Sequence, residues 1–214
     1  MRSTSTSMAG SSLNLFWFTL FSILIISTAI DTIEPTQLIR DGETIVSAGE
    51  KFQLGFFSPN NSQNRYVAIW FNKISVLTTV WVANRETPLM DSSGLLTVTN
   101  QGSLAILNGN ESIIWSSNST RSTQDPIAQL LDSGNLVLRE RNDTNPENYL
   151  WQSFDYPCDT LLAGMKLGRS NVTGIDRYLS SWKSNSDPSR GNFTIQLDSH
   201  GFPQVVMMQG PHLH

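Results

Sequence analysis

Short runs in which apolar and polar residues alternate fill the chain from residue 30 onward. A period of two places successive side chains on opposite faces of a strand, and helical periodicity is hard to find. Turn-forming stretches such as Ser58–Asn61 and Asp132–Gly134 separate the runs. Many short strands with turn signals between them predict an all-β barrel, sandwich or prism. The predicted strands are Phe52–Phe57, Tyr66–Phe71, Thr79–Ala83, Leu95–Thr99, Ser103–Leu107, Ser112–Trp115, Asn135–Leu138 and Tyr149–Trp151.

A repeated unit sharpens this prediction. Segment Gly102–Asn118 aligns with Gly134–Phe154, with the strand cores offset by 32 residues and the tryptophans near their ends by 36. The second copy therefore has four extra residues. They fall in the polar stretch Arg139–Asn148, where a hairpin loop tolerates insertion. One hairpin cannot bury its own apolar face, so the copies are expected to pack around a common core.

Tryptophans end or interrupt four of the predicted strands, at Trp70, Trp81, Trp115 and Trp151. A fainter, earlier copy of the unit is expected to end at Trp70. Strand-embedded rings flanked by Ile and Val are usually buried, so we expect the four to form a shared aromatic core. The alternative is a set of platforms on which sugar rings stack.

The first 29 residues have the layout of a cleavable signal peptide. Arg2 supplies a positive charge, Leu13–Ile26 is an apolar run of 14 residues, and Ser27–Ala29 offers small residues before a cut after Ala29. The run is short for a membrane span of about 20 residues; an uncleaved anchor or a buried helix is the alternative. No second apolar stretch of spanning length follows. We therefore expect a secreted, extracellular chain without a membrane anchor.

The charge balance excludes a typical nucleic-acid partner. After removal of the signal peptide, 13 basic and 18 acidic residues remain, and no basic stripe is present. Export would make N-glycosylation available to exposed Asn-x-Ser/Thr sites. The six predicted N-glycosylation sites are Asn60, Asn110, Asn118, Asn142, Asn171 and Asn192.

Cys158 is the only cysteine, so an internal disulfide is excluded. We expect it to be buried as a small hydrophobe, with an intermolecular bridge as the alternative. A nucleophilic thiol would need a nearby histidine, and all three histidines lie near the C-terminal end of the sequence. Two of them, His212 and His214, make a poor metal site without further ligands.

Other enzymatic interpretations are weak as well. Asp155 and Asp159 resemble a carboxylate pair for glycoside cleavage, but beside Pro157 they are expected to fix turns. The sequence contains no phosphate-binding loop and no kinase signature set. The prediction is a non-enzymatic chain without a metal or cofactor.

Long stretches of the chain resemble the bulb-type, mannose-binding lectin module. They are most similar to the version found in the ectodomains of plant S-domain receptor-like kinases and S-locus glycoproteins. The resemblance covers nearly all of the chain after the signal peptide. The matching stretches are Asp31–Pro59, Tyr66–Phe71, Val80–Leu89, Leu130–Glu140, Leu150–Gly168 and Ser180–Gln204.

The resemblance implies a β-prism of three four-stranded sheets with pseudo-threefold symmetry and core tryptophans. It implies a signal peptide at 1–29, a lectin domain at 30–154 and a partial second, lectin-like segment of the S-domain at 155–214. Full-length relatives continue into an EGF-like or cysteine-rich region, a PAN module, a transmembrane helix and a kinase. None of these is found here, so the chain looks like a truncated ectodomain. Relatives usually have Thr at position 158.

Bulb-type lectins resemble one another in a strand motif, Gln-x-Asp-x-Asn-x-Val-x-Tyr. Alternation places its polar side chains on one face, where they meet sugar hydroxyls, and the valine meets the apolar ring face. In the second copy only Asn135 and Val137 match, and Asn135 has an alternative role in closing a hairpin turn. In the first copy no position matches. The aligned residues are Leu131, Ser133, Asn135, Val137 and Arg139 in the second copy, and Thr99, Gln101, Ser103, Ala105 and Leu107 in the first.

Together these features predict a secreted, glycosylated recognition module with a degenerate mannose site. Its expected partners are proteins or a modified glycan surface: a receptor ectodomain, a peptide ligand, or a mannose-type glycan bound weakly or not at all. One alternative is an active mannose-binding defence lectin, and another is a soluble decoy or co-receptor for a full-length receptor kinase. A third is a truncated product whose second segment folds poorly.

Overall fold

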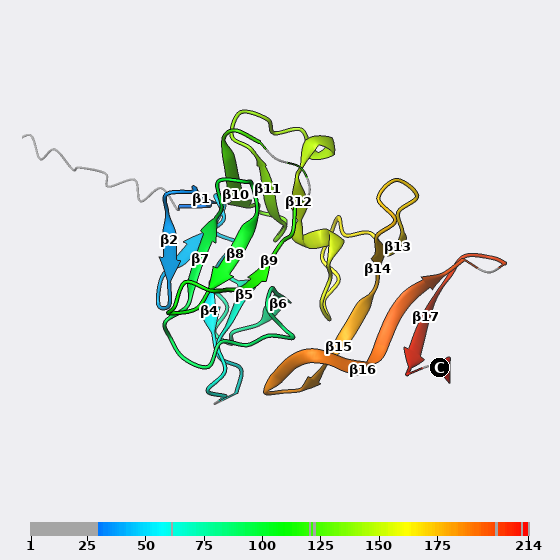
Figure 1. The fold of residues 1–214 in the computed structure, drawn as a ribbon. Coiled ribbons are helices and arrows are strands. Elements are labelled where there is room, and N and C mark those ends of the chain that lie inside the picture. Colours follow the sequence, from blue (N-terminus) through cyan, green and yellow to red (C-terminus); the bar gives the residue numbers. More distant parts are fainter. Residues whose placement is uncertain are drawn as a thin grey trace, which may run out of the picture.

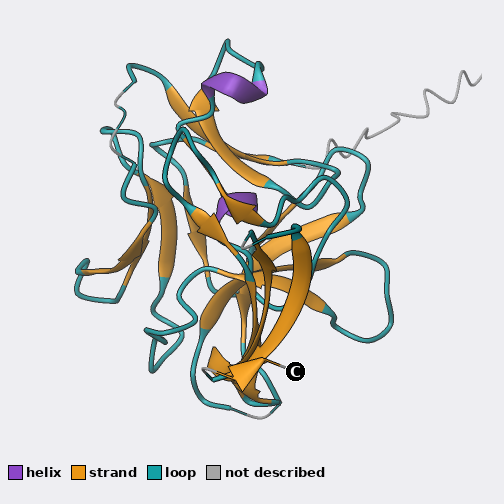
Figure 2. Ribbon diagram, turned by 90° about the vertical axis from the view of Figure 1, so that its right-hand side faces the viewer, coloured by secondary structure: helices purple, strands orange, loops and turns teal. Residues whose placement is uncertain are grey.

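The computed structural model describes residues 30–60, 62–119, 121, 123–199, 201–210 and 212–213, and the predicted signal peptide lies outside them. Strands dominate this part of the chain, which confirms the all-β class (Figure 2). Its two helices are single 3₁₀ turns, η1 (Pro146–Asn148) and η2 (Ser153–Asp155). Within the described ranges, no helix has the length and apolar character needed to cross a membrane.

Three four-stranded antiparallel sheets form a prism, which occupies the left of Figure 1. One strand of each sheet comes from the N-terminal stretch of residues 32–46, so this stretch joins all three sheets. The first sheet contains β3 (Thr44–Val46), β4 (Phe52–Phe57), β5 (Tyr66–Phe71) and β6 (Thr79–Val82); the second contains β2 (Leu38–Arg40), β7 (Leu95–Val98), β8 (Leu104–Leu107) and β9 (Ile113–Ser116); the third contains β1 (Thr32–Ile33), β10 (Pro126–Leu130), β11 (Leu136–Glu140) and β12 (Trp151–Gln152).

Three tryptophans meet where the last strands of the sheets converge. Trp81, Trp115 and Trp151 have ring centroids 5.8 to 6.2 Å apart and interplanar angles of 64° to 75°. This is the edge-to-face arrangement that aromatic pairs prefer. The aromatic core is therefore confirmed for these three rings, and the equivalent register of the three sheets shows the pseudo-threefold symmetry. The paired residues are Trp81 with Ile69, Trp115 with Ile106, and Trp151 with Leu138.

Trp70 does not end the first copy of the unit, and that prediction is wrong. Its strand β5 occupies the place that β8 and β11 have in their sheets, and β6 with Trp81 is the last strand. Trp70 lies on the opposite face of β5 from Ile69, because successive strand residues alternate. Its Nε1 donates a hydrogen bond to Gln53 Oε1 at 2.9 Å. Both β5 and β6 contain a tryptophan among apolar residues, so the hydrophobic pattern alone could not distinguish them.

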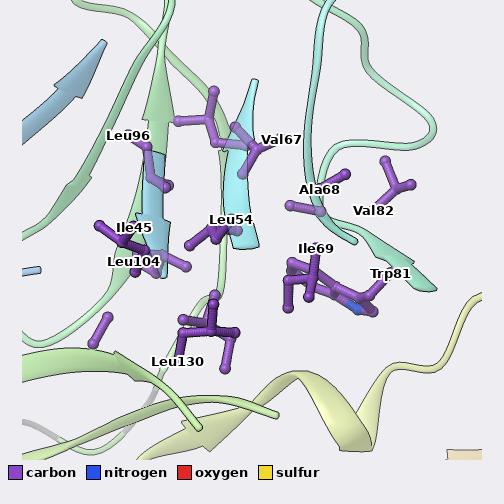
Figure 3. Packing of buried hydrophobic residues seen from close by; sticks show 14 of the residues in the cluster. Ile45, Leu54, Val67, Ala68, Ile69, Trp81, Val82, Leu96, Leu104 and Leu130 are labelled. Atoms are coloured by element: carbon purple, nitrogen blue, oxygen red, sulfur yellow. The ribbon is translucent and has the colours of Figure 1, made fainter. Parts of the chain in front are cut away.

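Aliphatic side chains from all three sheets fill the prism interior, as Figure 3 shows. Leu54, Leu104 and Leu130 come from three different sheets, and each is completely buried. Each copy of the unit thus supplies one apolar face to this shared core. Because a Leu→Ala substitution at any of the three would leave a cavity, we expect it to lower the free energy of unfolding by about 2–5 kcal/mol.

A second β segment follows η2 and lies against the end of the prism, at the right of Figure 1. It consists of a short hairpin and a four-stranded antiparallel sheet. The hairpin strands are β13 (Gly168–Arg169) and β14 (Asp176–Arg177); the sheet strands are β15 (Leu179–Ser184), β16 (Asp187–Asp198), β17 (Gln204–Gln209) and β18 (His212–Leu213).

Candidate functional site

The predicted sugar-binding strand is β11 in the third sheet, together with the turn before it. Leu136 and Leu138 point into the prism core. The motif positions Asn135, Val137 and Arg139 alternate with them and therefore lie on the outer face of the sheet, whereas Ser133 lies in the turn before the strand. This outer face is nevertheless covered, because Asn135, Val137 and Arg139 have exposed fractions of 6%, 0% and 7%.

Asn135 is fully engaged in holding the fold. Its Oδ1 accepts hydrogen bonds from Ser153 Oγ and Phe154 N, both at 3.2 Å. Its Nδ2 donates to Gln152 Oε1 at 2.9 Å. The side chain thus ties β11 to β12 and η2 instead of facing solvent.

The hairpin turn before β11 does not need Asn135 in a left-handed conformation. Gly134 takes that conformation, with φ of 83°, and its N–H donates to Leu131 O at 2.9 Å. Gly102 has the same φ in the equivalent turn of the second sheet. Glycine adopts positive φ without the steric cost that a side chain brings, so Gly134 and not Asn135 is the left-handed residue of this turn. Asn135 does close the turn through its backbone, because its carbonyl accepts a hydrogen bond from Leu131 N at 2.9 Å.

Arg139 stands where the motif has tyrosine, and its guanidinium is bound within the third sheet. Its Nε and Nη2 donate to Gln129 Oε1 at 3.1 and 2.9 Å, and Nη1 donates to Arg141 O at 2.6 Å. Gln129 Nε2 in turn donates to Asp31 Oδ2 at 2.8 Å. Polar groups on this face therefore have partners within the protein, and Val137 has no open surface for a sugar ring.

The other two sheets lack the motif at the equivalent strands. On β8 and the residue just before it, the Asn, Val and Tyr positions of the motif hold Ser103, Ala105 and Leu107, as in the sequence alignment of the first copy. On β5, which the sequence did not identify as a motif strand, the register of Ile69 with Trp81 places Tyr66, Ala68 and Trp70 at the Asn, Val and Tyr positions. All three are buried, with exposed fractions of 1%, 0% and 9%.

The asparagines of the six predicted glycosylation sites all lie on the surface. Such exposure is what an attached glycan requires. Asn60 and Asn118 have positive φ, 35° and 48°, so each lies in a sharp turn. Two other members of these motifs, Asn61 and Thr120, fall outside the described residues. Glycan attachment stays a prediction.

Cys158 is 1% exposed, as predicted. Its Sγ accepts a hydrogen bond from Val82 N at 3.2 Å and donates one to Val82 O at 3.5 Å. Burial is the main cause that raises the pKa of the thiol. The group therefore behaves as a neutral hydrogen-bonding side chain that caps the edge strand β6, and a threonine hydroxyl offers the same donor and acceptor.

Arg85 is the residue that sequence reasoning missed. It follows β6, is 7% exposed, and reaches from the prism into the second segment. Its Nε donates to Pro188 O at 2.6 Å, Nη1 to Ser180 Oγ at 2.9 Å, and Nη2 to Ser181 O at 3.2 Å. A charged residue directly after an apolar strand was the available signal. Its partners lie about a hundred residues further along, so the signal could not show what it binds.

The two acidic residues near Cys158 each accept hydrogen bonds from different neighbours. Asp155 accepts hydrogen bonds from Arg177 Nε at 2.7 Å and Gln152 Nε2 at 3.2 Å. Asp159 is exposed and bonded to the Thr160 hydroxyl at 3.2 Å. Asp155 thus stabilises the start of the second segment. Among the described residues, no group of three or more metal-ligating side chains comes together.

Comparison with known proteins finds mannose-binding lectins. A family model described as D-mannose binding lectin matches residues 78–183. Among solved structures, a monocot mannose-binding lectin from Gastrodia elata is similar, with a TM-score of 0.43 and 20% identity over 57% of this chain and 93% of that one. The snowdrop mannose-specific agglutinin, from Galanthus nivalis, has a TM-score of 0.41 and 15% identity over 54% and 94%.

Curated relatives match almost the whole chain. The G-type lectin S-receptor-like serine/threonine-protein kinase RKS1 of Arabidopsis thaliana is 44% identical over 92% of this chain and 23% of its own length. The S-locus-specific glycoprotein S6 of Brassica oleracea is 39% identical over 93% of this chain and 47% of its own length. The chain thus spans less than half the length of either relative.

The fold and the matched region define a bulb-type lectin domain. The chain belongs to the family of plant G-type lectin S-receptor-like kinases and S-locus glycoproteins.

Proposed function

We propose that this chain is a secreted, glycosylated recognition module of an S-domain ectodomain whose strand motif does not bind mannose. Its ligands are proteins or glycans that contact another surface. The observation that carries the proposal is the burial and hydrogen bonding of the two matching motif residues. Val137 is completely buried, and both polar ends of the Asn135 side chain are bonded within the protein.

Energetics supports the loss of mannose binding. Two of the three polar motif side chains are replaced, by Leu131 and Ser133. Each hydrogen-bonding partner left without its match costs about 1–3 kcal/mol. Two such losses correspond to at least about a 30-fold weaker affinity. The network from Asp31 through Gln129 to Arg139 would also have to open before a sugar could approach.

The domain plan is part of the proposal. Removal of residues 1–29 would release the chain outside the cell, the lectin domain would span 30–154, and residues 155–214 would belong to a second segment. The chain itself would perform no catalysis, because its acidic residues and its cysteine serve packing and turns. The exposure of the six sequon asparagines supports an extracellular, glycosylated state.

A glycan array probed with the purified chain tests the proposal. We expect no strong, saturable signal from terminal mannose. A strong mannose signal would identify the chain as an active mannose-binding lectin and would contradict the proposed loss of the site. A Ser133→Tyr variant, which places a bulky ring at the second motif position, in the turn before β11, is the control because it would remove a true strand-site signal.

A second candidate is a soluble co-receptor or decoy that pairs with a receptor ectodomain. The apolar face of β16 and β17 favours it. Leu197, Val205 and Met207 are 37%, 63% and 45% exposed. The register pairs Leu197 with Val205 and Ile195 with Met207, which places these side chains on one face.

Co-precipitation with a full-length receptor ectodomain tests this candidate. We expect capture that a Val205→Asp substitution abolishes, because a buried unpaired charge is costly at an interface. A Val172→Asp variant is the matched control, since Val172 is 95% exposed on the loop between β13 and β14. Equal loss in both variants would contradict pairing through this face.

A further inference from the structure

A cleft of about 450 Å³ lies between the end of the prism and the second segment. The tryptophan trio Trp81, Trp115 and Trp151 lines it from the prism side. Tyr156, from the connection after η2, and Tyr178, just before β15, line it from the other side. Concave sites with aromatic walls and a few polar groups are the usual form of small-ligand sites.

Tyr156 is the most accessible aromatic ring of this junction cleft. It stacks on Trp151 with a centroid distance of 5.7 Å and an interplanar angle of 14°. Trp151 covers one face of the tyrosine ring, so the 47% exposed fraction of Tyr156 belongs to the other face and to the hydroxyl edge. The stack fixes the plane of the ring and leaves a flat apolar platform.

Two polar side chains at the same cleft are free to bind a ligand. Asp176 and Asn118 are exposed and line the cleft. Within the described part of the chain, neither side chain makes a hydrogen bond to protein. A carboxylate accepts, and an amide both donates and accepts, so together they match the hydroxyl groups of a sugar.

The charges of the cleft balance and favour a neutral ligand. Arg177 Nη2 pairs with Asp155 Oδ1 at 2.7 Å, and Arg190 Nε lies 3.9 Å from Glu86 Oε1. The remaining lining charges are Asp176 and the buried Arg85, one of each sign. A strongly anionic or cationic ligand would therefore find no uncompensated field.

The cleft is preformed, because strong contacts fix its two sides. Arg85 bonds to three residues of the second segment, as described above. Trp81 Nε1 donates to Tyr156 O at 2.9 Å, and Val82 N donates to Cys158 Sγ at 3.2 Å. A ligand would thus bind without the entropy cost of assembling the two walls.

We propose that this junction cleft is a binding site for a neutral saccharide. The apolar face of a sugar ring lies on Tyr156, and ring hydroxyls bind to Asp176 and, where Asn118 has no attached glycan, to the Asn118 amide. This inference rests on the proposed function, in which recognition has moved away from the β11 strand, and it names the surface and the ligand class. A sugar fits because it combines an apolar C–H face with an edge of hydroxyl groups.

Calorimetry and ligand-observed NMR on the complete secreted chain test the inference, with mannotriose and chitotriose as probes. The measured quantity is saturable binding. We expect at least one probe to bind. Tyr156→Ser removes the platform and should weaken that binding about tenfold. Asp176→Asn should weaken it several-fold and, being an exposed change, should leave the fold intact. Ser133→Tyr, in the turn before β11, is the control and should have no effect.

Asn118 is also a predicted glycosylation site, so the sugar has two sources. An Asn118→Gln variant separates them. If added sugar binds only to this variant, the chain's own glycan occupies the cleft in the wild type, which supports the same site. If it binds to both forms, the site takes an external glycan.

Two results would overturn the inference. One is binding that Ser133→Tyr removes while Tyr156→Ser and Asp176→Asn keep it; this places the sugar on β11 and also contradicts the proposed function. The other is no saturable binding of either probe to the wild type or to Asn118→Gln. In that case recognition through protein contacts can still be tested by co-precipitation, so the two failures are distinguishable.

Discussion

At the scale of single residues, the side chains that look most chemical in the sequence serve the fold. Cys158 caps the backbone of Val82, and Asn135 anchors β12 and η2. The sequence predicted the burial of Cys158, because a lone cysteine usually behaves as a small hydrophobe. It could not predict the role of Asn135, since the three groups that bind its side chain lie 17 to 19 residues away.

Replacing Cys158 distinguishes a hydrogen-bonding role from a reactive one. Cys158→Thr keeps a donor and an acceptor for Val82, and we expect its free energy of unfolding within about 1 kcal/mol of the wild type. Cys158→Ala leaves Val82 N–H buried without a partner and should cost about 1–3 kcal/mol. Urea denaturation measures both.

A thiol-labelling reagent provides an independent check on Cys158. Burial raises the pKa of the thiol, so little thiolate forms and access is blocked. We expect labelling only after unfolding. Fast labelling of the folded chain, or equal stability of the Thr and Ala variants, would contradict the capping role.

At the scale of elements, hydrophobic periodicity predicted the strands whose apolar and polar residues alternate regularly. It could not predict which residues of neighbouring strands pair. The strands β4 and β5 were predicted to the residue, and the extra residues of the second copy lie in the β11–β12 connection, which contains η1. The strand β10 begins at Pro126 and was missed, as were the two- and three-residue strands β1 to β3. Of these, β1 and β2 pair with strands far along the chain, β10 and β7. Short strands give too few residues for a period to show.

The tryptophan trio is expected to be energetically coupled. Trp115→Phe and Trp151→Phe each replace one ring of the same edge-to-face pair with a smaller ring. Their double-mutant cycle, measured by urea denaturation, should therefore show a coupling free energy of about 0.5–1.5 kcal/mol. Trp70 lies on the other face of its strand. We expect Trp70→Phe to be additive with Trp151→Phe, and coupling of similar size in both cycles would contradict the assignment of the trio.

The turn before β11 is linked to the turn between β3 and β4 through Asp132. Its Oδ1 accepts a hydrogen bond from Gly49 N at 2.7 Å. Hydrogen bonds from the Ser47 hydroxyl and from Gly49 N lower the pKa of Asp132 below its ordinary value. A carboxyl whose pKa is lower in the folded state stabilises the fold above the unfolded pKa, about 3.9, and loses this effect as pH falls through the folded value.

Acid titration of an Asp132→Asn variant tests this link. We expect the wild type to be more stable near neutral pH and the difference to shrink below about pH 4, as Asp132 becomes protonated. Glu147→Gln is the control, because Glu147 is an exposed carboxyl on η1. A stability difference for Asp132→Asn that stays constant down to pH 2 would contradict the assignment.

At the scale of the whole molecule, one buried arginine joins two β units. The family resemblance predicted the prism and a following β segment, and the structure has both. Arg85 is the most buried charged group at the contact between them, and it donates to the carbonyls of Pro188 and Ser181 and to the Ser180 hydroxyl. Arg85 meets these acceptors only when both units are folded, so no local sequence pattern could reveal the contact.

Arg85→Met is expected to loosen the second segment without unfolding the prism. The substitution leaves buried acceptors unsatisfied. We expect limited proteolysis to cut within residues 157–199 faster than in the wild type, while the prism remains resistant. Arg40→Met, an exposed arginine on β2, is the control and should leave the pattern unchanged. Simultaneous loss of both units in Arg85→Met would show that they unfold as one.

We propose above that the outer face of β11 does not bind mannose. An amide-resolved NMR titration of the isotope-labelled chain with methyl α-mannoside tests it most directly. We predict no saturable shift at the amides of Asn135, Val137 and Arg139, because the side chains there are buried and bonded within the protein. Saturable shifts centred on Val137 would show that mannose binds to this face and would contradict the proposal.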